Sequence, residues 1–244
     1  MNKKIIGITG ASQFTPQVRE MVEKYFKAIP LDIMQNGSDD LTRIASVCDG
    51  FIFAGGVDIC PTSLEHEKRE VQNGLGYTKF DVKRDKRELT LIEIAAAQKK
   101  NIFGICRGHQ MLLAHAGLHL IADISRYSEV CHNPRDIEMQ GEPVHFIEGV
   151  GNGIKEFAEQ TLVNSYHHQA IRFDGKVEAN LFGVEVLATS HTIYADHKTP
   201  EELIVELARG AGFLSCQWHP EADWNSVESS EKVLGMAKQM FGIK

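Results

Sequence analysis

Residues 101–110 read NIFGICRGHQ, and this run carries the strongest structural signal in the chain. Its apolar first half predicts a buried strand over Asn101–Ile105, and the segment Gly108–Ala116 predicts a helix directly after it. The cysteine at the junction has one glycine two places before it and another two places after it. This spacing is the cysteine form of a strand–nucleophile–helix turn, and it indicates an α/β protein with Cys106 at the turn.

Alternating strands and helices precede this run. The predicted strands are Lys3–Thr9, Leu31–Met34 and Gly50–Ala54, and the predicted helices are a segment beginning at Thr15-Pro16, then Leu41–Val47 and Asp85–Lys100. Such alternation is typical of a mostly parallel central sheet with helices on both faces. The stretch Val57–Phe80 shows no period and contains Pro61, so we expect a long irregular loop of the kind that is usually functional.

The second half of the chain has a different pattern, in which turns rather than helices separate the strand candidates. These candidates are Leu118–Ala122, Val144–Ile147, Leu162–Ser165, Val184–Ala188, Ile193–Ala195, Leu203–Leu207 and Phe213–Gln217. We therefore expect a smaller, partly antiparallel β portion there, followed by a last helix over Val227–Phe241. No repeat or linker divides the chain, which predicts one domain over residues 1–244.

The composition argues against several classes of protein. With 43% hydrophobic residues, the 244-residue chain is long enough for one sizeable core. A formal charge of −7 and the lack of a basic run argue against a nucleic-acid partner. The apolar stretches are strand-sized, so we expect no membrane span, and Lys3–Thr9 is interpreted as a strand rather than a signal peptide. The five cysteines form no CxxC pair, which favours a reducing, cytoplasmic location over a disulfide framework or a zinc ribbon.

Cys106 is the candidate nucleophile. At the turn its thiol would be exposed at the N-terminus of the following helix, where the helix dipole favours a thiolate. Side chains at positions 104 and 108 would collide with neighbouring backbone, and glycine avoids the collision. The amide of Arg107 would point into the same space and could donate to an oxyanion. A cysteine in such a place can also be a small buried hydrophobe, but the two glycines favour the nucleophile.

Residues 217–221, QWHPE, offer a partner for the thiol. Pro220 favours an extended conformation at His219, and residues two apart in an extended chain project to the same side. We therefore expect the Glu221 carboxylate to hold one ring nitrogen of His219 while the other faces a thiol. On its own, this segment could equally be a surface turn with a chance histidine and glutamate.

Gly55-Gly56, directly after a predicted strand, forms the third segment of interest. Two glycines let backbone amides approach a ligand closely, as a second oxyanion donor must. Without the other two segments, a simple strand-to-loop turn would be the better interpretation.

Taken together, these motifs resemble those of a known group of enzymes. G-G-V-D at 55–58, G-x-C-R-G-x-Q at 104–110 and Q-W-H-P-E at 217–221 are similar to class I glutamine amidotransferase domains and their hydrolase relatives. N-S-Y-H-H-Q-A-I at 164–171 resembles the γ-glutamyl-γ-aminobutyrate hydrolase branch of the C26 peptidases, as do Arg84-Asp85 and Glu88. The resemblance spans essentially the whole chain and implies a flavodoxin-like, doubly wound α/β fold.

The resemblance also implies roles for particular residues. It implies a Cys106-His219-Glu221 triad with oxyanion donors at Gly56 and Arg107. The substrate-binding residues that it implies are Gly55, Val57, Gln110, Ser165, Tyr166 and His167. It implies no cofactor. His167 and His168 could suggest a metal site, but neighbouring strand residues point to opposite faces, so we expect no metal.

Three features depart from the pattern of that branch. His109 stands where an apolar residue is more usual, Gly117-Leu118-His119-Leu120 replaces G-G-T-L, and Ser190–Pro200 is longer than a short turn between strands. They bear on the leaving-group side of the substrate rather than on the chemistry. The sequence assigns no role to His109 or to Ser190–Pro200.

We therefore expect a cysteine-dependent hydrolase that cleaves a γ-glutamyl amide through a thioester and releases glutamate and an amine. Its expected partner is a small γ-glutamyl substrate, such as γ-glutamyl-γ-aminobutyrate or a γ-glutamyl polyamine, and neither nucleic acid nor a membrane. Two alternatives stay open: a glutaminase subunit that delivers ammonia to a separate synthase, and a non-catalytic relative that binds a small ligand. The leaving amine and the oligomeric state, a homo-oligomer included, also stay open.

Overall fold

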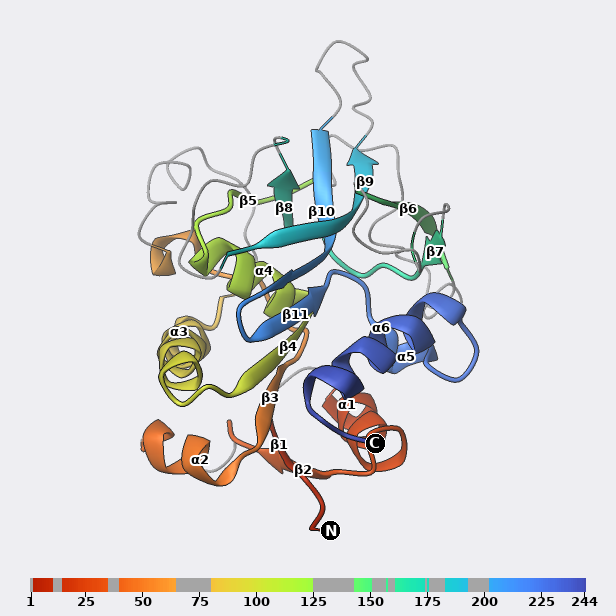
Figure 1. Ribbon diagram of the computed structural model, residues 1–244. Coiled ribbons are helices and arrows are strands. Elements are labelled where there is room, and N and C mark those ends of the chain that lie inside the picture. Colours follow the sequence, from red (N-terminus) through yellow and green to blue (C-terminus); the bar gives the residue numbers. More distant parts are fainter. Residues whose placement is uncertain are drawn as a thin grey trace.

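The computed structural model is an α/β fold built on one sheet, which has eleven strands among the described residues. The structure describes residues 2–10, 15–34, 40–64, 80–124, 143–150, 157, 161–173, 175, 183–192 and 202–244. Nine strands follow one another in the order β2-β1-β3-β4-β11-β10-β9-β6-β7, and β5 and β8 pair beside this path (Figure 1). The predicted fold class is confirmed.

The first half of the chain supplies most of the parallel part of the sheet. The parallel strands are β1 (Ile5–Thr9), β2 (Ile29–Asp32), β3 (Gly50–Phe53), β4 (Asn101–Ile105) and β11 (Phe213–Cys216). The helices packed on it are α1 (Thr15–Lys24), α2 (Leu41–Val47), α3 (Val82–Ala97), α4 (Arg107–His115) and α6 (Glu228–Met240). The bounds of α2 and β4 are those predicted, whereas α3 begins three residues before Asp85. The Asp81 carboxylate caps α3 by accepting a hydrogen bond from the Arg84 N–H, which explains the earlier start.

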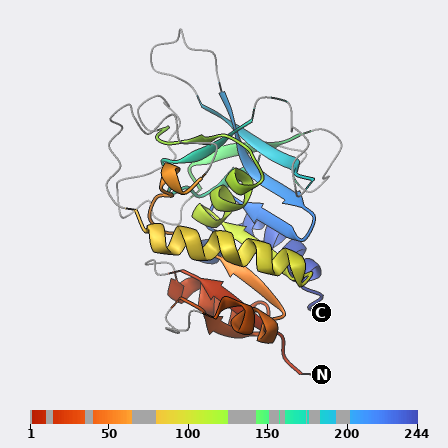
Figure 2. The same cartoon turned by 90° about the vertical axis from the view of Figure 1, so that its left-hand side faces the viewer.

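Two apolar cores lie on opposite faces of this part of the sheet. Side chains of α1 and α6, such as Met21 and Leu234, belong to the first core, and side chains of α2, α3 and α4, such as Leu91, belong to the second. Successive strand residues alternate between them, Phe51 in the second core and Ile52 in the first. Figure 2 shows the face that α3 covers. No helix within the described ranges has both the length and the apolar character that crossing a bilayer requires.

The second half of the chain forms antiparallel pairs, as its turn-separated pattern predicts. The strands are β5 (Leu120–Ile121), β6 (His145–Gly149), β7 (Thr161–Val163), β8 (Ala170–Phe173), β9 (Glu185–Thr192) and β10 (Glu202–Gly210). This portion is continuous with the parallel part because β10 pairs with β11. The predicted strand Ile193–Ala195 lies outside the described residues, as does most of Ser190–Pro200. Within the predicted irregular loop Val57–Phe80, a short 3-10 helix spans Pro61–Ser63, and residues 65–79 are outside the described ranges.

The candidate residues gather at the carboxyl ends of neighbouring parallel strands. In the register of the sheet, Phe53 of β3 lies opposite Gly104 of β4, and Ile105 of β4 lies opposite Cys216 of β11. Residues 55–56, 106 and 219 therefore leave the sheet at the same edge. In open α/β sheets this edge is where ligands bind.

Candidate active site

Cys106 lies at a strained turn between β4 and α4. Its backbone has φ +52° and ψ −106°, which non-glycine residues rarely adopt, and it is the N-cap of α4. A Cβ at Gly104 would lie 2.6 Å from Leu112 Cδ1, and a Cβ at Gly108 would overlap the Phe53 carbonyl. The prediction that both glycines are needed for space is confirmed. Cys106 is 5% exposed, more enclosed than predicted, because it packs into the first apolar core.

His219 and Glu221 meet, but not in extended chain. Pro220–Asp223 form the short helix α5, with His219 as its N-cap and Pro220 in its first turn. His219 Nδ1 lies 2.7 Å from Glu221 Oε1, and both residues are buried. The predicted extended conformation is wrong here because the fixed φ of proline also suits the first turn of a helix. With Nδ1 on the carboxylate, Nε2 is left for the Cys106 thiol, whose charge also acts on the ring.

The surrounding charges favour a protonated His219. Burial alone lowers the pKa of this imidazole, but the charges of Glu221 and Cys106, with their hydrogen bonds to the ring, outweigh burial and raise the pKa to about 10. At neutral pH the imidazolium form of His219 is therefore favoured. Such an imidazolium places a proton donor beside the candidate nucleophile.

Asn164 fixes the backbone of His219, a role that its place in a sequence motif does not reveal. Its Oδ1 accepts from the His219 N–H at 2.8 Å, and its Nδ2 donates to the His219 carbonyl at 2.9 Å. Nδ2 also donates to Asp223 Oδ2 at 2.6 Å. Burial raises the pKa of Asp223 to about 6, although the hydrogen bond from Asn164 acts in the opposite direction. No local sequence signal marks an asparagine that brackets a peptide 55 residues away.

The glycine pair after β3 packs against this site. A Cβ at Gly55 would lie 2.6 Å from His219 Cε1, and a Cβ at Gly56 would overlap the guanidinium of Arg84. The same Cβ position at Gly56 lies 3.6 Å from Arg107 Cδ, so the two residues predicted as oxyanion donors are close neighbours. Gly56 and Val57 are exposed. Arg107 is the first residue of α4, and its N–H is one of the amides that a helix leaves free at its N-terminus.

Several of the residues implied to bind substrate use their polar groups for contacts within the protein. Those that are buried are Gln110, Ser165 and His167, whereas Tyr166 is half-buried. Gln110 Nε2 donates to the Gln169 carbonyl at 2.7 Å, and His167 Nδ1 lies 2.9 Å from the same oxygen. The ring of Tyr166 lies edge-on to that of His219, with centroids 5.3 Å apart. Tyr166, like Gly55, therefore lies against the candidate imidazole.

His167 and His168 have different partners, as expected for neighbouring residues. His168 Nε2 lies 2.8 Å from Asp58 Oδ1, and its Nδ1 lies 3.6 Å from Asp123 Oδ1. The hydrogen bond with Asp58 and the charges of both aspartates raise the pKa of His168 against the effect of burial. His168 thus ties the loop after β3 to the segment that follows β7.

His109 joins α4, the helix that follows Cys106, to the sheet. It is fully buried, with Nδ1 2.9 Å from Ser215 Oγ of β11 and Nε2 3.0 Å from the Val205 carbonyl of β10. Burial lowers its pKa to about 4, so the ring is neutral at physiological pH. These contacts place His109 between α4 and the sheet rather than at the leaving-group side of the site.

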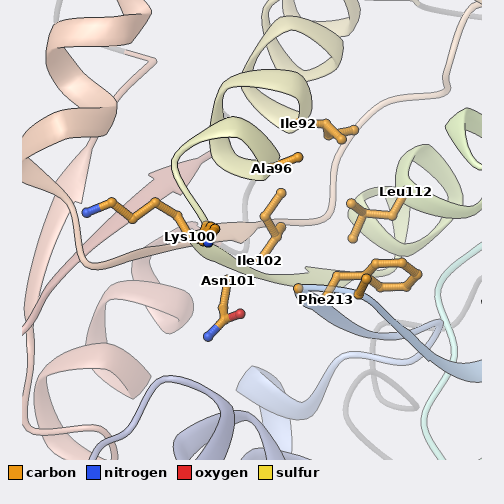
Figure 3. A pocket seen from close by; sticks show the side chains of 10 residues that line it. Ile92, Ala96, Lys100, Asn101, Ile102, Leu112 and Phe213 are labelled. Carbon is orange, nitrogen blue, oxygen red and sulfur yellow. The ribbon is translucent and has the colours of Figure 1, made fainter. Parts of the chain in front are cut away.

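A separate cavity of about 350 Å³ lies at the opposite end of β4 (Figure 3). Ile92, Asn101 and Phe213 are among the residues that line it. Asn101 begins the strand whose other end leads to Cys106, so the length of β4 separates this cavity from the candidate site. Lys100 at its edge donates from Nζ to the Cys48 carbonyl at 2.7 Å.

Comparisons with known proteins identify the family and agree with the fold. Residues 4–221 match the Peptidase C26 family. The chain is 29% identical over 206 residues to the putative glutamine amidotransferase-like protein YvdE of Lactococcus lactis, covering 84% of this chain and 78% of that protein. It is 28% identical over 158 residues to the gamma-glutamyl-gamma-aminobutyrate hydrolase of Escherichia coli O157:H7, covering 61% of this chain and 56% of that protein. The crystal structure of a glutamine amidotransferase from Thermotoga maritima shares the fold, with a TM-score of 0.56 and 15% identity over 98% of this chain and 84% of that one.

Proposed function

We propose that this chain, which belongs to the Peptidase C26 family, is a cysteine-dependent hydrolase that cleaves the γ-glutamyl amide bond of a small compound. The observation that carries the proposal is the placement of Cys106, His219 and Glu221 together at the carboxyl edge of the sheet. Cys106 sits on a strained turn and acts electrostatically on His219, whose Nδ1 lies 2.7 Å from the Glu221 carboxylate. This is the arrangement of nucleophile, base and orienting group that acyl transfer requires.

In the first half-reaction, the Cys106 thiolate attacks the γ-carbonyl carbon and a carbon–sulfur bond forms. The carbonyl oxygen becomes an oxyanion, which the amides of Gly56 and Arg107 stabilise. The His219 imidazolium then gives its Nε2 proton to the amine nitrogen as the carbon–nitrogen bond breaks. The products of this half are the free amine and a γ-glutamyl thioester.

In the second half-reaction, water attacks the thioester. His219, now neutral, takes one proton from the water at Nε2, and the same two amides stabilise the second oxyanion. When the carbon–sulfur bond breaks, glutamate leaves and the thiolate–imidazolium pair is restored. Glu221 accepts from His219 Nδ1 and keeps the ring oriented throughout, and neither half-reaction uses a cofactor.

The class of substrate follows from the same family relationship. The Escherichia coli relative is named a gamma-glutamyl-gamma-aminobutyrate hydrolase, and we infer that this chain takes a γ-glutamyl compound such as γ-glutamyl-γ-aminobutyrate or a γ-glutamyl polyamine. We also infer a reducing, cytoplasmic setting. The four described cysteines, Cys48, Cys60, Cys106 and Cys216, are all free thiols, which supports that inference.

The test is hydrolysis of a panel of glutamyl amides, with released glutamate measured by mass spectrometry. We expect γ-glutamyl amides to be cleaved and the matched α-glutamyl isomers not to be. Cys106→Ala should lower turnover by about 10⁴-fold or more without loss of fold. Cys48→Ala is the control, because Cys48 lies in the second core at the opposite edge of the sheet.

Full activity of the Cys106→Ala protein would refute the proposed mechanism. Efficient hydrolysis of free glutamine, rising when a synthase is added, would instead support the glutaminase alternative.

A further inference from the structure

Four buried charges lie directly beneath the candidate site. Arg84, Asp85 and Glu88 come from α3, and Arg107 is the residue after Cys106; each is at most 2% exposed. Glu88 accepts from Arg84 Nε at 2.9 Å through Oε1 and from Arg107 through Oε2. Asp85 accepts from the other terminal nitrogen of Arg107. Two positive and two negative charges therefore form one continuous, neutral network, which we call the buried quartet.

The buried quartet contacts the backbone that carries the first candidate oxyanion amide. Arg84 Nη1 donates to the Gly55 carbonyl at 3.1 Å, and Nη2 donates to the Ala54 carbonyl at 2.6 Å. The Gly55 carbonyl and the Gly56 N–H belong to one planar trans peptide, in which they point in opposite directions. By holding the carbonyl, Arg84 directs the Gly56 N–H away from the buried quartet, toward the open side of the loop.

The buried quartet also holds the residue that carries the second amide. The side chain of Arg107 is clamped by Asp85 and Glu88, while its backbone N–H begins α4 beside Cys106. Because Arg84 and Arg107 share Glu88, the positions of the two amides are set relative to each other. At Gly56 itself there is no room for a side chain, since a Cβ there would overlap the Arg84 guanidinium.

Stability alone does not account for such a network. Taking charges out of water costs several kcal/mol per ion, and apolar residues of similar volume are often as stabilising as a buried ion pair. The Glu88 charge is nevertheless kept: burial raises the pKa of Glu88, but the charges of Arg107 and Arg84 outweigh it and leave the pKa below its ordinary range. At Asp85 burial outweighs the charge of Arg107, and the pKa of that carboxyl is raised. A function in orienting other groups is a better explanation.

We propose that Arg84 and Glu88 are positioning residues that orient the oxyanion-stabilising amides of Gly56 and Arg107 without touching the substrate. The inference rests on the proposed function, and it adds two residues on α3 to the machinery of the site. It predicts that their loss affects the step in which an oxyanion forms and spares reactions of Cys106 that form none.

Alkylation by iodoacetamide separates these two kinds of reaction. The Cys106 thiolate displaces iodide from the methylene carbon, a carbon–sulfur bond forms, and no carbonyl oxygen gains charge. Hydrolysis of a γ-glutamyl amide needs the same thiolate and, in addition, the two amides. The decisive measurement is therefore the ratio of kcat to the Cys106 labelling rate.

For Arg84→Lys we expect kcat to fall by about 10- to 100-fold, below the 10²- to 10³-fold effect of removing an oxyanion donor outright, because the amide stays in place. KM and the labelling rate should stay within about twofold of the wild-type values, since neither depends on the oxyanion. The matched control is Arg87→Lys, the same substitution one turn along α3, where Arg87 bonds the Ile33 carbonyl instead of the buried quartet. This control should keep its kcat.

A milder variant covers the case in which Arg84→Lys fails to fold. Thr9 Oγ1 donates to Glu88 Oε1, and Thr9→Val removes this hydrogen bond at nearly constant volume. It should lower kcat with labelling unchanged. The inference is overturned if the folded variants keep kcat, or if kcat and labelling fall in the same proportion. If the wild-type protein hydrolyses no γ-glutamyl amide, the proposed function fails and the inference falls with it.

Discussion

Replacing Glu221 with glutamine tests whether one carboxylate sustains the charge pair of the site. The substitution keeps the shape and an oxygen that can accept from His219 Nδ1, and it removes the charge. The pKa of His219 is about 10 although burial lowers it, and the Glu221 charge is the largest of the effects that raise it. Against an ordinary value of 6.5, this corresponds to a net imidazolium stabilisation of about 5 kcal/mol, which remains after the opposing effect of burial has been overcome. Without Glu221, burial should favour the neutral thiol–imidazole pair at pH 7.

The assay is the rate of Cys106 labelling by iodoacetamide between pH 5.5 and 9.5, read by peptide mass spectrometry, with turnover measured in parallel. The raised pKa of His219 keeps the imidazolium present until the pH passes about 10, so wild-type labelling should vary little across this range. Labelling of Glu221→Gln should be slow at neutral pH and rise with pH, as for an ordinary thiol. Turnover of the variant should fall by about 10²- to 10⁴-fold.

A second glutamate–histidine pair provides the control. Glu93 Oε1 lies 2.8 Å from His115 Nε2 at the protein surface, and Glu93→Gln should leave both labelling and turnover unchanged. If the labelling profile of Glu221→Gln superimposes on that of the wild type, the carboxylate does not support the pair and the reasoning is refuted.

Two further predictions concern stability. Gly108→Ala places a Cβ against the Phe53 carbonyl, so the free energy of unfolding in urea should fall by about 1–3 kcal/mol; an unchanged midpoint would contradict this. Burial raises the pKa of Asp223 from 3.8 to about 6, so the folded state binds this proton more tightly than the unfolded chain does. The free energy of unfolding should therefore decrease as the pH rises from about 4 to 6. Asp223→Asn should therefore raise the free energy of unfolding at pH 7.5 by about 1–3 kcal/mol and flatten its pH dependence between pH 4 and 7; a less stable variant at pH 7.5 would disprove the explanation.

Local sequence patterns predict those elements whose conformation depends mainly on neighbouring residues in the sequence. β4 is an apolar run, and its bounds match the prediction. β2 begins two residues before the predicted Leu31 and contains Pro30, which normally argues against a strand. It is tolerated because, among the described strands, β2 pairs with β1 alone and forms an edge of the sheet, where a missing N–H is harmless. The local pattern does not predict β8, since its pairing depends on β5 and β10, far away in the sequence.

The same distinction separates the predicted site residues from those that only the structure reveals. Cys106 follows from glycines two places away, and the contact of His219 with Glu221 spans two residues. Asn164 reaches His219 from 55 residues away, and Arg84 reaches the Gly55 carbonyl from 29. Such contacts exist only once the sheet has brought the carboxyl ends of its strands together. No sequence period or residue spacing predicts these long-range contacts.

Backbone strain gives an independent reason to assign function to Cys106. Among the described residues, the non-glycine residues with positive φ are Lys27, Lys99 and Cys106. Lys27 and Lys99 follow the C-terminal ends of α1 and α3, where a left-handed residue is a common way to end a helix. After α3, for example, the Lys100 N–H donates back to the Ala95 carbonyl of the last helical turn. Cys106 precedes a helix, so no such ending explains its conformation. Strain of this kind persists only where the surroundings maintain it. Gly104 and Gly108 leave the space that the turn needs, and a nucleophile placed beside His219 is the functional reason that we assign to the strain.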